Sequence, residues 1–138
     1  MDIASLLEER IDPGTLPIAV GDIVFLLAFL TIGALQHNPG DYLVENPLVW
    51  AGIVAPFLIG WIAVSPLVGA YSPGAGESAK SSIPLAVRSW ILAAVVGMAL
   101  RASPLFAGGF AVVFAAIMLV GGALFLGGWR YLYFKLFG

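Results

Sequence analysis

One acidic side chain lies inside a long apolar stretch of this sequence. Asp22 belongs to residues 17–36 (PIAVGDIVFLLAFLTIGALQ), and this stretch contains no other acidic or basic residue. A carboxylate near the centre of a bilayer costs roughly 2.5–3.5 kcal/mol on insertion scales, so it needs a partner or a functional reason. Asp22 is therefore the first candidate for binding a proton or a cation.

Arg88 is the basic residue that we expect beside Asp22. At 1.5 Å per helical residue, Asp22 lies about 7–8 Å beyond Pro17 and Arg88 about 6 Å beyond Pro84, so the two depths match. An arginine can bind a carboxylate through two hydrogen bonds, and Arg130 is a second candidate partner. Two interpretations remain open: an ion pair that fixes helix register, or a titrating carboxylate tuned by an arginine.

A polar stripe follows Asp22 along residues 17–36. The helical wheel places Gly33 and Gln36 near Asp22, with His37 at the edge of the same face. A polar stripe on a membrane helix faces protein or a water-filled cavity. Because histidine titrates near neutral pH, an Asp22-to-His37 line could relay protons; the alternative is a solvated histidine at a helix end.

Two further features interrupt the regular pattern of the second apolar stretch. Pro56 and Pro66 each remove a backbone donor, which predicts a kink and a carbonyl free to line a pathway. Proline also occurs in membrane helices that have no transport role. Trp61 lies deeper than the usual interfacial aromatic belt, so we expect its indole N–H to find a partner on the Asp22 stripe.

Residues 105–129 repeat small side chains every seven positions, at Gly108, Ala115 and Gly122. Small residues at this spacing allow close helix approach. The spacing predicts a packing seam within the bundle or an interface between copies.

Composition places these residues in a membrane. The chain has 138 residues, of which 61% are hydrophobic and 10% charged, against about 25% charged in soluble domains. Four apolar stretches can each cross a hydrocarbon core of about 30 Å as a helix: residues 17–36, 48–70, 84–100 and 105–129. We therefore predict an all-α integral membrane bundle of four transmembrane helices at residues 17–138. Residues 1–16 would form an amphipathic or disordered cytoplasmic segment.

The basic residues predict the orientation. Four spans place both termini and the loop at residues 71–83 on one side, and that side carries all the basic residues except Arg101: Arg10, Lys80, Arg88, Arg130 and Lys135. The positive-inside rule then puts both termini in the cytoplasm and the chain in the cell membrane, as a multi-pass protein. Few lysines and a pI near 5.1 point to a halophilic source.

The chain lacks the residues that several kinds of binding or catalytic site require. The chain has no cysteine and one histidine, so we predict no disulfide, metal or cofactor site. It has no phosphate-binding loop, convincing nucleophile or nucleic-acid site, so we expect no enzyme.

The two halves of the chain are weakly alike. Gly33 precedes His37 by four residues at the end of the first span, as Gly97 precedes Arg101 at the end of the third. Two similar helical hairpins would form a parallel repeat, an arrangement that some transporters use.

Short motifs in order along the chain carry a family resemblance. They are Gly21-Asp22, Gly33 with His37, Pro56-Phe57, Gly60-Trp61, Gly97-Met98, Leu100-Arg101 and Gly128-Trp129-Arg130. Together they resemble domain-of-unknown-function family 3054, small four-span membrane proteins of halophilic archaea and actinobacteria. The resemblance implies the four-span fold and supplies no activity or catalytic residue.

Two functions fit these residues. The first is proton- or cation-linked transport of a small solute through a homo-oligomer, because four short helices enclose little volume. The alternative is a structural or assembly subunit of a membrane complex, docked on a membrane protein partner through the seam of the fourth span. In both, the lipid bilayer surrounds the protein.

Overall fold

A computed structural model describes residues 10–106 and 111–138, and the chain is helical through nearly all of them. The described part contains no β-strand. Its helices, with 3-10 turns labelled η, are η1 (Pro13–Thr15), α2 (Leu16–Leu35), α3 (Gly40–Glu45), α4 (Pro47–Val68), η2 (Pro73–Gly76), α5 (Ala79–Ala102) and α6 (Val112–Phe137). Helices α2, α4, α5 and α6 are each long and apolar enough to cross a membrane, which confirms the all-α, four-span prediction.

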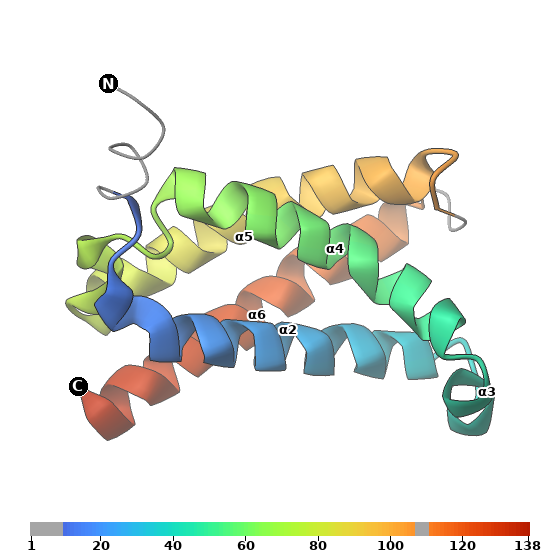
Figure 1. Cartoon of the computed structure of the whole chain (residues 1–138), viewed down its shortest axis with the longest axis horizontal. Helices are drawn as coiled ribbons and strands as arrows, with labels where there is room; N and C mark the ends of the chain where they lie inside the picture. The colour runs from blue at the N-terminus through green and yellow to red at the C-terminus, as the bar shows by residue number, and fades with distance from the viewer. Residues whose placement is uncertain (1–9, 107–110) are drawn as a thin grey trace.

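The four spans run alternately in opposite directions and form a ring (Figure 1). Helix α4 packs on α5, α5 on α6, α6 on α2 and α2 on α4. The C-terminus and the N-terminal side of α2 lie at one end, which we call the terminal end (Figure 1). Helix α3 lies at the opposite end, which we call the α3 end.

Two spans have boundaries that differ from those expected. Helix α5 begins at Ala79, ahead of the expected residue 84, because the Ser78 side chain accepts a hydrogen bond from the Ser81 N–H at 3.4 Å and caps the helix. Helix α6 covers Val112–Phe137 where residues 105–129 were expected, so Arg130 lies well inside a helix. The N-terminal amphipathic segment predicted at residues 1–16 falls mostly outside the described residues.

A glycine ends α4 and reverses the chain at the terminal end of the bundle. Gly69 has φ +100°, in the left-handed region that favours glycine, and the N–H groups of Gly69 and Ala70 both donate to the Ser65 carbonyl. The next residue, Tyr71, accepts a 2.7 Å hydrogen bond at its carbonyl from the Asp12 N–H. This turn closes the terminal end of the bundle with backbone contacts.

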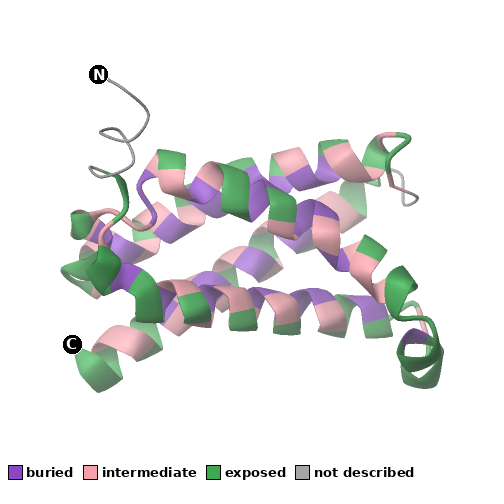
Figure 2. Cartoon of the chain, in the orientation of Figure 1, coloured by how far each residue is buried: buried purple, intermediate pink, exposed green. Residues whose placement is uncertain are grey.

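The buried residues lie where the spans face one another (Figure 2). The largest apolar ones, Trp61, Trp90 and Phe57, are at most 1% exposed. A Cβ added at Gly122 would overlap the Trp90 indole ring, and the Trp90 Nε1–H donates to the Met118 carbonyl of α6 at 2.9 Å. Gly122 therefore lets Trp90 of α5 reach the α6 backbone.

Candidate functional site

Asp22 is paired with Arg130 at the terminal end of the bundle. The Arg130 Nη2–H donates to Asp22 Oδ2 at 2.6 Å and the Nε–H donates to Oδ1 at 3.2 Å, which is a two-point contact between α6 and α2. Both side chains are 0% exposed. Asp22 lies about 9 Å beyond Leu16 and Arg130 about 10 Å before Phe137, so the two side chains meet at one depth.

The third guanidinium nitrogen of Arg130 reaches two other segments. Nη1 donates to the Ala70 carbonyl at 3.0 Å, and to the carbonyl and hydroxyl oxygens of Ser82, both at 3.2 Å. Ala70 follows α4 and Ser82 lies in the first turn of α5. Arg130 thus joins all four spans, and its buried charge is compensated by a carboxylate and three neutral acceptors.

Tyr71 extends this contact into a network. Its hydroxyl donates to Asp22 Oδ2 at 2.8 Å and accepts a 2.8 Å hydrogen bond from the Trp61 Nε1–H. Burial, and then the adjacent Asp22 charge, raise the pKa of Tyr71 above its ordinary value of 10. Tyr71 therefore keeps its proton and stays a donor to the carboxylate. We call Asp22, Arg130, Tyr71 and Trp61 the ionic network.

The prediction that Asp22 contacts Arg88 is wrong. Arg88 is exposed on α5, whereas the next two residues, Ser89 and Trp90, face the bundle interior and are buried. Depth along the membrane does not define the direction in which a side chain points, and the second candidate, Arg130, has the right direction. The indole of Trp61 does reach the Asp22 stripe, through Tyr71.

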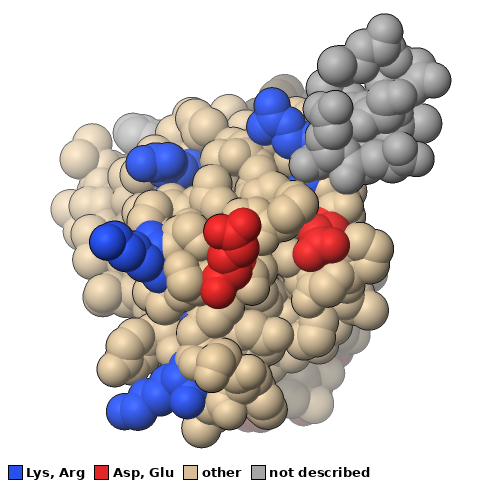
Figure 3. Space-filling view, turned by 90° about the vertical axis from the view of Figure 1, so that its left-hand side faces the viewer, with Lys and Arg blue, Asp and Glu red and all other residues tan. Residues whose placement is uncertain are grey.

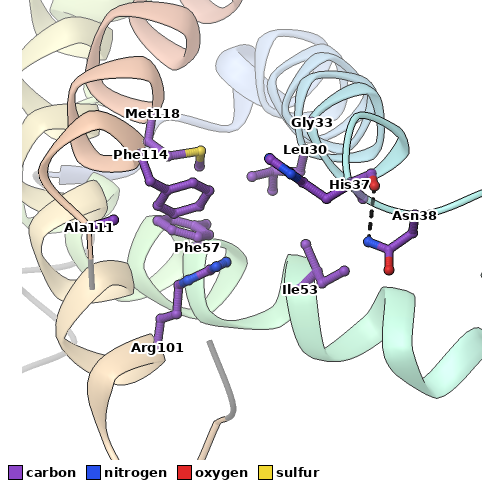
Figure 4. A pocket seen from close by; sticks show the side chains of 11 residues that line it. Leu30, Gly33, His37, Asn38, Ile53, Phe57, Arg101, Ala111, Phe114 and Met118 are labelled. Carbon is purple, nitrogen blue, oxygen red and sulfur yellow. Dashed lines mark hydrogen bonds between the residues drawn. The ribbon is translucent and has the colours of Figure 1, made fainter. Parts of the chain in front are cut away.

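A cavity of about 330 Å³ opens at the α3 end among all four spans (Figure 4). Its walls are mainly apolar: Leu30 of α2, Ile53 and Phe57 of α4, and Phe114 and Met118 of α6. Leu30, Phe57 and Met118 are buried and form its deep end. This volume is at the lower limit of the range for small-molecule sites, about 300–1,000 Å³.

Two basic side chains line the same cavity. His37, just beyond α2, and Arg101, near the end of α5, project from different sides of it (Figure 4). The Arg101 guanidinium carbon lies over the Phe114 ring, 4.0 Å from the ring centre, within the range of a cation–π contact. Gly33 lies beside His37, and a Cβ at Gly33 would meet no atom within 4 Å.

Large apolar side chains separate the cavity from the ionic network. Between them lie Leu26 of α2, Trp90 of α5 and Leu126 of α6, and each is 0% exposed. On α6 the step from Met118 at the cavity to Arg130 takes about three turns. These apolar side chains therefore interrupt the predicted Asp22-to-His37 line. Asp22 lies near the start of α2, and His37 lies just beyond its other end.

The remaining predicted residues have packing positions. Pro56 is buried next to Phe57, and α4 continues as a helix through it. Gly122 is covered by Trp90, so this part of the predicted seam packs within the bundle. Ala115 is half-buried on α6, and Gly108 lies outside the described residues.

Tyr71, Ser82 and Arg101 are site residues that sequence reasoning did not assign. Tyr71 is 49 positions from Asp22, and Ser82 is 48 from Arg130, so no local spacing connects them. Arg101 did carry a signal, since it corresponds to His37 in the weak similarity between the hairpins.

Exposed charges gather at the terminal end, where basic side chains surround two acidic patches (Figure 3). The exposed basic residues in or next to the elements at that end are Arg10, Lys80 and Lys135. Among the described residues, no group of three or more histidine, cysteine, aspartate or glutamate side chains could hold a metal ion.

Residues 19–133 match the model of a family described as "Protein of unknown function (DUF3054)". This match agrees with the resemblance carried by the short motifs. Neither the curated proteins nor the solved structures include a match to the chain.

Proposed function

We propose that this chain, which belongs to the family of proteins of unknown function DUF3054, is a proton-linked carrier of a small solute. One observation carries the proposal: the four-span bundle is closed at the terminal end by a buried ionic network and open at the α3 end through a cavity. A carrier needs a site that opens to one side while the other side is closed.

The ionic network supplies a proton-sensitive closure. Arg130 joins the four spans while Asp22 is charged. A proton on the Asp22 carboxylate removes its charge and leaves the buried Arg130 without an ionic partner, which weakens the closure. The proton thus favours opening at the terminal end. No covalent step is involved.

The orientation and surroundings follow from the charges. We place the terminal end in the cytoplasm and the chain in the cell membrane, because exposed basic residues cluster at that end. Exposed apolar side chains along the spans, such as Val20, Val24 and Ile62, then contact lipid. An apolar groove between α5 and α6, lined in part by Ala123, Gly127 and Gly128, gives a second copy of the chain room to pack.

The test is solute-coupled proton movement in proteoliposomes that contain a trapped pH-sensitive dye. Gradients of 4-toluenesulfonate, glucose and tetramethylammonium sample an anionic, a neutral and a cationic solute. We expect one of them to drive internal acidification with the natural chain and with Arg88→Gln, but not with Asp22→Asn. If none of the three moves protons above empty liposomes, the carrier proposal is wrong.

A structural or assembly subunit is the second candidate. It is favoured by the same ion pair, because every guanidinium nitrogen of Arg130 already has a hydrogen-bond acceptor. This function predicts a membrane protein that co-purifies in fixed stoichiometry from gentle detergent, together with no proton movement in the liposome assay.

A further inference from the structure

We infer that the cavity at the α3 end binds an organic monoanion with an apolar body, with Arg101 holding the anionic group. The inference rests on the carrier proposal and names the chemical class of its solute. Nothing in the family match assigns a ligand to this cavity.

The charge at the cavity favours an anion. Arg101 and His37 both line it, and the described lining includes no acidic residue. The acidic residues that lie nearest to His37 along the chain are Asp41 and Glu45. Both belong to α3, and neither lines the cavity. A guanidinium stays charged at every physiological pH, so Arg101 gives this side of the cavity a permanent positive charge.

The geometry suits a planar or tetrahedral anionic group. The Arg101 guanidinium carbon lies over the Phe114 ring, 4.0 Å from the ring centre. A guanidinium presents its N–H groups in a planar fork that carboxylates and sulfonates accept. His37 lies across the cavity as a second polar contact (Figure 4).

The deep end of the cavity suits an apolar body. Leu30, Phe57 and Met118 line it, and each is less than 10% exposed. Methionine and phenylalanine together adapt well to flat apolar rings. A ligand with its charge at Arg101 and its apolar part against these three residues satisfies both halves of the cavity.

Two sources supply this chemistry: a water-soluble aryl or alkyl acid from outside the cell, and a fatty acid from the bilayer. The experiment uses the full chain in nanodiscs of zwitterionic lipid and measures the dissociation constants of two ligands by titration calorimetry. They are 4-toluenesulfonate and its neutral analogue 4-toluenesulfonamide, which have nearly the same shape. Competition by oleate then separates the two sources: displacement of the sulfonate points to the fatty acid, and no displacement to the soluble acid.

We expect the sulfonate to bind the natural chain at least about tenfold more tightly than the sulfonamide, since a charge-assisted hydrogen bond contributes about that factor. Arg101→Gln should remove the difference. The matched control, Arg88→Gln, removes an exposed arginine from the same helix and should leave both constants unchanged. Equal binding of the two ligands to the natural chain overturns the inference, whether or not Arg101→Gln folds.

Binding and transport fail separately in this design. If the sulfonate binds through Arg101 but no solute moves protons in liposomes, the anion site stands and the carrier proposal falls. If glucose or tetramethylammonium moves protons and the sulfonate does not bind, the carrier proposal stands and the anion site is wrong.

Discussion

A double-mutant cycle at Asp22 and Arg130 tests whether these two residues hold the terminal end together. The variants are Asp22→Asn, Arg130→Gln and the combination of both. The pair is 0% exposed, and its two hydrogen bonds measure 2.6 and 3.2 Å. Each single change leaves a charged group in the interior without its ionic partner.

The expected cost follows from this burial. Breaking a buried ion pair by removing one partner destabilises a protein by about 3–5 kcal/mol, because the remaining charge is uncompensated. Arg130→Gln should lie at the upper end of that range, because it also frees the acceptors at Ala70 and Ser82. The double variant buries neither charge, so it should cost little more than either single change and less than their sum, a coupling of at least about 2 kcal/mol.

The assay is the free energy of unfolding in mixed micelles, measured by titration with a denaturing detergent and read by tryptophan fluorescence. Arg88→Gln serves as the control, and since Arg88 is exposed we expect a change within about 0.5 kcal/mol. Additive costs from the two single changes would refute the pairing. So would an Asp22→Asn variant as stable as the natural chain.

Two other predictions concern neighbouring contacts. Tyr71→Phe removes the hydroxyl between Trp61 and Asp22 and should cost about 1–2 kcal/mol near neutral pH. Because the pKa of Tyr71 is raised, the folded chain keeps a proton that the unfolded chain releases above about pH 10. The free energy of unfolding of the natural chain should therefore fall more steeply than that of Tyr71→Phe as the pH rises past 10. Equal slopes of unfolding free energy against pH would contradict this prediction. Gly122→Ala should destabilise by about 1–3 kcal/mol, since the added Cβ overlaps Trp90, whereas Gly52→Ala, which meets open space, should be neutral or stabilising by up to about 1 kcal/mol. The same denaturing-detergent titration compares the two glycine variants, and equal changes in their free energies of unfolding would argue against the close packing at Gly122.

The sequence predicted the spans because apolar length is a local property. Asp22 was also identifiable, since an acid in an apolar stretch is conspicuous wherever the helix packs. Its partner was not, because counting residues gives depth along the membrane but not direction around the helix. The direction separates exposed Arg88 from buried Arg130.

The cavity and Tyr71 depend on tertiary structure. Tyr71 reaches Asp22 only because Gly69 ends α4 with a left-handed turn. The cavity depends on how the four spans separate at the α3 end, which no single segment encodes. The weak similarity of the hairpins did pair His37 with Arg101, and both residues line the cavity.

The most direct test of the account measures which side of the membrane reaches the cavity. The chain has no native cysteine, so single cysteines can be placed at Gly33 and at Ser65. Gly33 lines the cavity and has space around it. Ser65 is buried on α4 beyond Trp61, and its hydroxyl has no hydrogen-bond partner in the described part. A membrane-impermeant thiol reagent is applied to right-side-out and inside-out vesicles. We predict that Gly33→Cys reacts from outside only and that Ser65→Cys is protected from both sides at neutral pH, becoming reactive from inside at low pH. Protection of Gly33→Cys from outside, or reaction of Ser65→Cys at neutral pH, would contradict a bundle that is open at the α3 end and closed by the ionic network.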